Sequence, residues 1–236
     1  MPDQSNADGL GRSPEQVIVV AGTDTGIGKT WTSVRLIEEL RTRGLTVAAR
    51  KPVESFEVSD GSGDSRLLAE ATGEARDVVC PPHRRYPVAM APPIAAIALG
   101  LPGFTLEHLL YEMAPADAAV QLVETVGGPR SPISDDADSA GLATALQPDL
   151  VILVADSSLG AINAVKLAED PLRAHRRIVL LNRFDPQDVL HVLNKEWLAA
   201  SGSDVVTSIS ELADRVEAGS GGGYSVAAPD PDPEDA

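Results

Sequence analysis

The sequence predicts an α/β fold: a doubly wound, mostly parallel sheet with helices on both faces, of the P-loop nucleotide-binding kind. An apolar run over 17–21 leads straight into a glycine-rich turn, and a helical pattern begins at Lys29. Further short apolar runs follow, and continuous runs of this kind are typical of parallel strands covered on both faces. Helical segments separate several of these runs, and such alternation indicates a parallel sheet with helices packed against it.

The first half of the chain is expected to begin with a strand over 17–21 and a long helix over 29–43. Apolar residues recur on one side of this helix at helical spacing, and Gly44 stands where a glycine commonly ends a helix. The other elements expected in this half are a strand over 46–50, a short helix over 65–71 that Gly73 ends, an irregular proline-rich stretch over 74–104 with a helix at 94–99, and a helix over 105–113.

The second half repeats the alternation of apolar runs and helical segments. Its apolar runs are rich in β-branched residues, which favours buried strands. The elements expected here are strands over 120–123, 150–155 and 178–181, helices over 161–167 and 189–200, a last strand over 205–207 and a last helix over 210–217.

We expect a single domain over 16–217, which is long enough for one large core. Residues 1–15 are polar and are expected to be disordered, and the glycine-rich acidic tail at 218–236 is expected to be flexible. The N-terminal residues lack the apolar segment of a signal peptide, and no apolar run reaches the ~18 residues of a membrane span. These patterns predict no membrane partner.

The composition narrows the class of partner. The formal net charge is −16, and because binding to nucleic-acid phosphates needs a basic surface, this charge argues against a nucleic-acid partner. The lone Cys80 argues against a disulfide framework and fits the reducing cytoplasm. We therefore expect a cytoplasmic protein that acts on a small molecule, with a structural thiol at Cys80.

The most informative motif is the run GTDTGIGKT at 22–30. A glycine-rich turn between a strand and a helix points backbone N–H groups inward beside a helix N-terminus, and this arrangement holds phosphate oxygens. Lys29 is expected to reach the β- and γ-phosphates, and the Thr30 hydroxyl to hold Mg²⁺. The common pattern has glycine where Thr23 stands, so this loop is a variant. The residues expected to bind the nucleotide here are Thr25, Gly26, Ile27, Gly28, Lys29, Thr30 and Thr32.

Charged residues follow three more of the predicted strands. Lys51 directly follows the second strand, where its cation could hold a γ-phosphate or a carboxylate, although most lysines lie on the surface. Glu124 ends the run at 120–123, and an acid in this place beside a phosphate loop is a common Mg²⁺ ligand. Asp156 ends the next run and competes for the same role.

Two further sites near strand ends are candidates. Asp64 opens the short helix after the second strand, where it could serve as an N-cap. Gly127 and Gly128 could supply backbone amides to a substrate, or could form a plain turn. With a phosphate loop, a metal and acids, the protein contributes positioning and charge stabilisation, which is the chemistry of phosphoryl transfer.

The order and spacing of these motifs resemble the dethiobiotin synthase family over residues 16 to about 190. The segments that carry the resemblance are GTDTGIGKT at 22–30, KPV at 51–53, Asp64 before Leu67 and Leu68, YP at 86–87 before AP at 91–92, VE at 123–124 with GG at 127–128, and LGAIN at 159–163. The resemblance implies a homodimer that depends on ATP and Mg²⁺. In this family a diamine is carboxylated by CO₂, the carbamate takes the γ-phosphoryl group, and a ring closes.

The resemblance also implies roles for individual residues. Lys29 and Lys51 would contact the phosphates and the reacting oxygen, and Asn182 matches the family's adenine-reading asparagine. Thr30, Asp64 and Glu124 would hold Mg²⁺. The segment Gly160, Ala161 and Asn163 would lie at a helix N-terminus that binds a substrate carboxylate across the dimer interface.

The departures from the family pattern lie mostly in the expected substrate pocket. The family reads KPVQTG, whereas here Glu54, Ser55 and Phe56 follow the valine; Ser55 keeps a hydroxyl, which we expect to serve catalysis and substrate binding. Thr125 and Val126 stand between Glu124 and the glycines. Ala164 replaces a usual histidine. Arg130 appears in a usually apolar segment, where it is expected either to hold an anionic substrate or to be a solvated loop residue.

These departures favour, at this stage, phosphoryl transfer to a different acceptor. The expected function is that of a kinase acting on a hydroxyl of an anionic metabolite, for example a nucleoside or a sugar. The alternative is an authentic dethiobiotin synthase. A weaker alternative is a partner-regulated switch ATPase, because related P-loop proteins of that kind carry a signature lysine five residues before the loop lysine, where this chain has Asp24.

Overall fold

The computed structural model describes residues 14–60 and 63–219. The predictions of a disordered start and a flexible tail concern 1–13 and 220–236 for the most part, and these lie outside the described residues. Within the described part, no helix is both long enough and apolar enough to cross a membrane.

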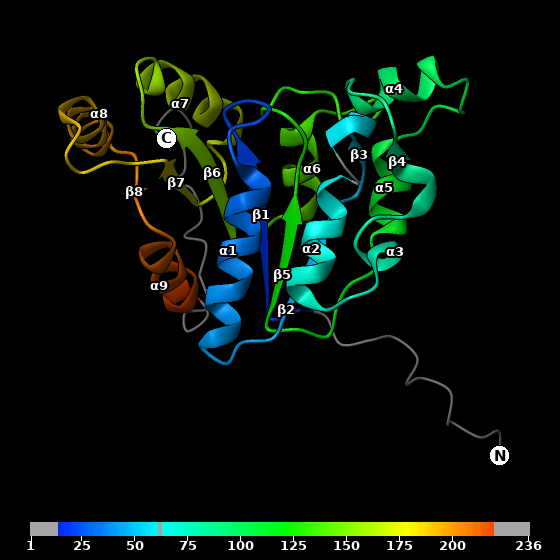
Figure 1. Cartoon of the computed structure of the whole chain (residues 1–236), viewed down its shortest axis with the longest axis horizontal. Coiled ribbons are helices and arrows are strands. Elements are labelled where there is room, and N and C mark those ends of the chain that lie inside the picture. The colour runs from blue at the N-terminus through cyan, green and yellow to red at the C-terminus, as the bar shows by residue number, and fades with distance from the viewer. Residues whose placement is uncertain (1–13, 61–62, 220–236) are drawn as a thin grey trace, which may run out of the picture.

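A parallel sheet of six strands forms the centre of the molecule, in the order β2-β5-β1-β6-β7-β8 (Figure 1). From β1 the chain crosses outward to β2 and returns to β5, which lies between them, and it then continues through β6, β7 and β8 on the other side of β1. The predicted doubly wound α/β fold is therefore confirmed. The strands are β1 (Gln16–Gly22), β2 (Val47–Arg50), β5 (Val120–Glu124), β6 (Leu150–Asp156), β7 (Arg177–Asn182) and β8 (Val205–Val206).

Helices cover both faces of this sheet, because successive strand residues point to opposite sides. Ile18 and Val20 of β1 pack into one core, and Val19 and Ala21 pack into the other. The helices that pack into the core of Ile18 are α1 (Lys29–Thr42), α2 (Asp64–Thr72) and α9 (Ile209–Gly219). Those of the opposite core are α4 (Pro92–Ala98), α5 (Leu106–Glu112), α6 (Ser139–Leu146), α7 (Ala161–Glu169) and α8 (Val189–Ala200).

The strands and long helices lie where the sequence predicts them, with bounds that differ by one or two residues. Several elements were not predicted. They include α6 and the strands β3 (Glu54–Ser55) and β4 (Arg85–Tyr86), which pair in parallel as a small second sheet. The remaining short elements are the helix α3 (Arg76–Val79) and the 3₁₀ helices Val58–Asp60, Pro82–Arg84 and Asp170–Leu172.

The strand order decides where functional side chains meet. All six strands run in one direction, so their carboxyl ends share one edge of the sheet, at the top of Figure 1. Because β5 lies between β1 and β2, the ends of these three strands are neighbours. Ligands of open α/β sheets bind at this edge.

Candidate active site

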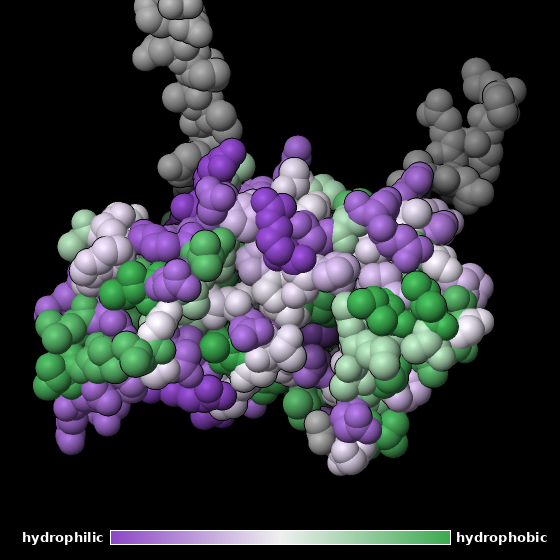
Figure 2. Space-filling view, turned by 90° about the horizontal axis from the view of Figure 1, so that it is seen from above, coloured by the Kyte–Doolittle hydropathy of each residue, from purple (hydrophilic) through white to green (hydrophobic). Residues whose placement is uncertain are grey.

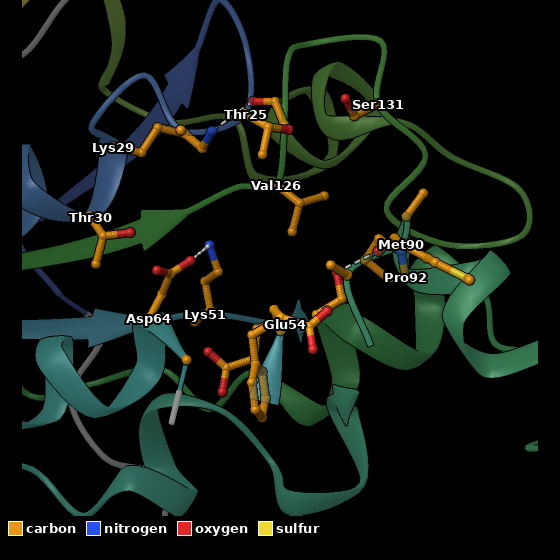
Figure 3. Close-up of a pocket in the computed structure, with 18 of the residues that line it drawn as sticks. Thr25, Lys29, Thr30, Lys51, Glu54, Asp64, Met90, Pro92, Val126 and Ser131 are labelled. Atoms are coloured by element: carbon orange, nitrogen blue, oxygen red, sulfur yellow. Dashed lines mark hydrogen bonds and ion pairs between the residues drawn. The ribbon is translucent and has the colours of Figure 1, made fainter. Parts of the chain in front are cut away.

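A cavity of about 640 Å³ opens at this edge, between the glycine-rich loop after β1 and the segment around β3 and α4. Figure 3 shows Lys29 and Thr30 on one side of it and Met90 and Pro92 on the other, with Lys51 between them. One side is therefore polar and cationic, and the other carries apolar side chains.

The glycine-rich loop turns into α1 through two glycines with positive φ. Gly26 has a φ of +72° and Gly28, the N-cap of α1, a φ of +103°. A side chain at Gly28 would also collide with Asn182, since a Cβ there would lie 2.2 Å from the amide nitrogen. The loop thus ends on a free helix N-terminus, which favours anions. Thr32 is fully buried in α1 and does not line the cavity.

Lys29 begins α1, and its ammonium group folds back over the loop. Its Nζ donates to the carbonyl oxygens of Asp24, at 3.0 Å, and Gly127, at 2.9 Å. Burial, and then the nearby cation of Lys51, lower the pKa of Lys29 to about 8. A neutralising anion at this place would oppose both effects.

Lys51 is fully buried at the end of β2, so the surface alternative is wrong. Its Nζ lies 2.7 Å from Oε1 of Glu124. It also lies 3.1 Å from Oδ2 of Asp64, and a dashed line in Figure 3 marks this pair. Burial alone would lower the pKa of Lys51, but the two carboxylates outweigh it and raise that pKa above the usual lysine value. Lys51 in turn lowers the pKa of Asp64. Lys51 and Asp64 are therefore both charged at neutral pH.

Glu124 accepts hydrogen bonds from two hydroxyls of α1 as well as from Lys51. Thr30 donates to its Oε1 at 2.9 Å and Ser33 to its Oε2 at 2.7 Å. Asp64 is the first residue of α2, and Gly63 is the N-cap, so Asp64 does not cap this helix.

These oxygens fit a magnesium ion. Asp64 and Glu124 both contact Lys51, and Thr30 donates to the Glu124 oxygen that Lys51 contacts. Mg²⁺ is commonly held by one or two carboxylates plus substrate phosphates. In residues 14–60 and 63–219, no group of three or more His, Cys, Asp or Glu could form a metal cage without such help. The donor set therefore suits a metal that arrives with a nucleotide.

The substrate side of the cavity is mainly apolar. Phe56 and Val126, two of the departures from the family pattern, both line it, as does Ser55, whose hydroxyl donates to the carbonyl of Met90. Gly127 lies beside the loop threonine: a Cβ there would be 3.6 Å from Oγ1 of Thr25. Gly128 packs against the backbone of Thr23 and does not line the cavity.

Other predicted residues lie elsewhere. The Arg130 side chain is 72% exposed and pairs with Asp138 at 3.0 Å. Of the two alternatives for this residue, the structure therefore supports a solvated loop residue. Asp156 pairs with Arg183 at 3.1 Å and also lies outside the cavity. Asn182 stands behind the loop, where its Nδ2 donates to the carbonyl of Ile27 at 2.9 Å.

The residues predicted to bind a substrate carboxylate lie at the N-terminus of α7. Gly160 is the N-cap of α7, and Ala161 and Asn163 follow in its first turn, outside the cavity of their own chain. Burial raises the pKa of Cys80 to about 12, which leaves its thiol protonated and unreactive.

Sequence reasoning missed three charged residues of the cavity wall, Glu57, Arg66 and Glu54, of which Glu54 is the buried carboxylate. This carboxylate is 1% exposed and bonds to Ser65 and Arg76. The signal that could have found it is the glutamate itself, which stands where the resembled family has glutamine.

Comparisons with known proteins agree with this geometry. Residues 16–215 match the family described as "AAA domain". The chain is 38% identical to the ATP-dependent dethiobiotin synthetase BioD of Xanthomonas campestris pv. campestris over 178 residues, 71% of this chain and 78% of that protein. It is 34% identical to the protein of the same name from Aquifex aeolicus, over 76% of this chain and 81% of the relative.

Solved structures are more distant. A plasmid partition protein from Borrelia burgdorferi superposes with a TM-score of 0.53 at 12% identity, over 88% of this chain and 98% of that one. This likeness concerns the fold alone. The two dethiobiotin synthetases, in contrast, match over 78% and 81% of their own length at 38% and 34% identity. The chain belongs to the dethiobiotin synthetase family of P-loop proteins.

Proposed function

We propose that the chain is a dethiobiotin synthetase that uses ATP and Mg²⁺. The observation that carries the proposal is the meeting of Lys29, Lys51 and Asp64 at one cavity with apolar side chains on its far wall. The buried Glu124 pairs with Lys51 behind this cavity, in a chain whose relatives bear this name. In the proposed reaction a diamine is carboxylated by CO₂, the resulting carbamate oxygen takes the γ-phosphoryl group of ATP, and attack by the second amine closes the ring and releases phosphate.

The chain's own residues bind, orient and neutralise charge. The N–H groups of the loop and the Lys29 ammonium bind the phosphates, which would replace the two carbonyls that Lys29 now contacts. Lys51, held between two carboxylates, offers a fixed cation to the oxygen that receives the phosphoryl group. Thr30, Asp64 and Glu124 hold Mg²⁺, which, when bound, neutralises charge that develops on the phosphate oxygens.

The preference for a hydroxyl acceptor finds no support. It depended partly on Arg130, which pairs with Asp138 and lies outside the cavity. It depended also on Thr125, which is fully buried and does not line the cavity, and on Phe56, which does line it. Phe56 and the neighbouring departure Val126 add apolar surface to the cavity wall, which suits the carbon chain of the diamine. The authentic synthetase, the alternative in the sequence analysis, is therefore the better proposal.

The alternative of a partner-regulated switch ATPase receives little support from the fold or from the phosphate loop. The fold is shared with a plasmid partition protein, but at 12% identity this likeness says nothing of function. The position of the signature lysine is occupied by Asp24, whose carboxylate accepts from the N–H of Thr25 at 2.7 Å.

We further propose that the enzyme acts as a homodimer in the cytoplasm. Gly160, Ala161 and Asn163 lie outside the cavity of their own chain, so the substrate carboxylate would meet them only on a second copy. An exposed apolar surface on α7 and α8 supports this arrangement, and its residues are Leu159, Leu167, Val189, Leu193 and Trp197. We infer the cytoplasmic location from the presence of a single cysteine, Cys80, which fits a reducing compartment.

A direct assay tests the proposal. Purified protein is incubated with 7,8-diaminopelargonate, bicarbonate and Mg-ATP, and dethiobiotin and ADP are measured by mass spectrometry. We expect one dethiobiotin for each ADP. ATP turnover without dethiobiotin, together with phosphorylation of a hydroxyl metabolite, would restore the kinase alternative.

A further inference from the structure

We propose that Glu54 is a positioning residue that holds Asp64 in its place beside Lys51 by fixing the N-terminal turn of α2. The inference depends on the proposed function for the role of Asp64 as a magnesium ligand. The position of Glu54 itself follows from contacts in the structure.

Glu54 is a buried carboxylate with a closed set of partners. Its Oε2 accepts from the backbone N–H of Ser65 at 2.8 Å, and its Oε1 accepts from the Ser65 hydroxyl at 2.5 Å and from Nη2 of Arg76 at 3.0 Å. Arg76 closes the set, because its Nε donates to the Ser65 hydroxyl at 2.8 Å. A buried charge persists only when it is paired and hydrogen-bonded in this way.

This set replaces a missing helix cap. The N-cap of α2 is Gly63, which has no side chain to accept from the first free N–H groups of the helix. Glu54 supplies that acceptor from another element, and its negative charge lies at the helix end that favours it. A Cβ on Gly63 would lie 2.8 Å from Oε2 of Glu54, so the glycine leaves room for this contact.

Asp64 directly precedes the residue that Glu54 holds. Its carboxylate points to Lys51 at 3.1 Å, as the dashed line in Figure 3 shows. Among the described residues, Glu54 holds the chain next to Asp64 through its contact with the N–H of Ser65. Loosening of this turn would move Asp64 away from Lys51 and Thr30 without altering the phosphate loop.

The test separates metal binding from nucleotide binding. Calorimetry gives the affinity for a non-hydrolysable ATP analogue with and without Mg²⁺, and the ratio of the two affinities is the magnesium enhancement. For Glu54→Ala we expect this enhancement to fall about tenfold, the usual scale for a residue that orients a metal ligand, while the affinity without Mg²⁺ stays unchanged. Glu70→Gln is the matched control, because it removes an exposed carboxylate of α2 that pairs with Arg66.

A double-mutant cycle shows whether Glu54 acts through Asp64. We expect Glu54→Ala to have no further effect on the enhancement in an Asp64→Ala background. An additive loss would overturn the inference, and so would an unchanged enhancement in Glu54→Ala. If Asp64→Ala itself leaves the enhancement unchanged, the metal assignment of the proposed function fails as well, which distinguishes the two failures.

A conservative variant covers the case in which Glu54→Ala does not fold. Glu54→Gln keeps an acceptor for the N–H of Ser65 but loses the charge that pairs with Arg76. We expect a folded protein, judged by circular dichroism, with an enhancement reduced several-fold. A wild-type enhancement in Glu54→Gln would reduce Glu54 to a structural role and overturn the inference.

Discussion

Lys29 is the residue on which the proposed chemistry depends most. We expect Lys29→Ala to lower kcat by about 10³, because the loss of a preorganised charge at the phosphates costs on this scale. Arg35→Ala is a suitable control, since it removes an exposed cation from the same helix that pairs with Glu38. Steady-state assays of both variants would check this, and turnover preserved in Lys29→Ala would contradict the site.

The lowered pKa of Lys29 predicts a pH dependence of nucleotide binding. The ammonium form binds phosphate, and in the free enzyme this form is lost as the pH rises through about 8. Bound phosphates favour the ammonium form, so affinity should fall with rising pH above that value and be full below it. One unit above the pKa, we expect affinity about tenfold weaker than at neutral pH.

Calorimetry of an ATP analogue across this pH range would measure the effect. Lys29→Met should bind more weakly and lack this decline, because it carries no titrating group. A wild-type affinity that is flat between pH 7 and 9.5 would show that another group neutralises the phosphates.

Single residues were predictable where local sequence decides their place. Thr30 and Lys29 follow from the loop motif, because turn, cap and helix start are consecutive. The partners of Lys51 and Arg130 were not predictable from local sequence. Glu124 lies 73 positions from Lys51, and the path of the loop brings Asp138 to Arg130. Such pairings depend on tertiary structure.

At the scale of elements, Gly63 has a strained backbone conformation and also lies close to the side chain of Glu54. Its φ is +80°, and a Cβ there would meet the Glu54 carboxylate. Gly44 provides a matched comparison, because its φ is +90° but no atom lies within 4 Å of its hypothetical Cβ. We expect Gly63→Ala to lower the free energy of unfolding by about 1–3 kcal/mol, more than Gly44→Ala does.

Urea unfolding of the two variants checks this difference. Equal losses of stability would indicate that strain alone acts and that the contact with Glu54 is unimportant. A larger loss in Gly63→Ala, together with a lower magnesium enhancement, would link this glycine to the position of α2.

Elements with strong local patterns were predicted well, and those without were missed. Helix α8 shows helical spacing and was predicted at its observed bounds. Helix α6 was missed: its sequence, SAGLATAL, is rich in small residues and shows little contrast between its faces. The pair of β3 and β4 contains only two residues in each strand, and its parallel register joins residues that lie 31 apart.

At the scale of the whole molecule, the site results from strand order. The chain makes β1, β2 and β5 in sequence, but the sheet inserts β5 between the other two. This insertion brings Lys51 and Glu124 together beside the phosphate loop. The alternation of strands and helices predicts a parallel sheet and a site at its carboxyl edge, but it does not determine which strand ends are neighbours.

The exposed apolar side chains on the surface of the molecule predict a homodimer. Figure 2 shows hydrophobic side chains gathered toward the two ends of the face in view, with mainly polar surface between them. The apolar surface on α7 and α8 adjoins Gly160, which the proposed reaction needs near the cavity of a second copy. We therefore expect twice the 24.6 kDa mass of one chain in solution, because burial of such a surface is favourable.

Leu193→Asp on α8 tests this assembly, because Leu193 is half-exposed and a buried carboxylate there would have no partner. We expect analytical ultracentrifugation to give a single-chain mass and dethiobiotin formation to fall at least tenfold, since the partner's α7 terminus would no longer reach the substrate. Tyr111→Asp, at a highly exposed site on α5, should leave both unchanged. A wild-type enzyme that is fully active as a monomer would contradict the dimer and would require a carboxylate-binding group within a single chain.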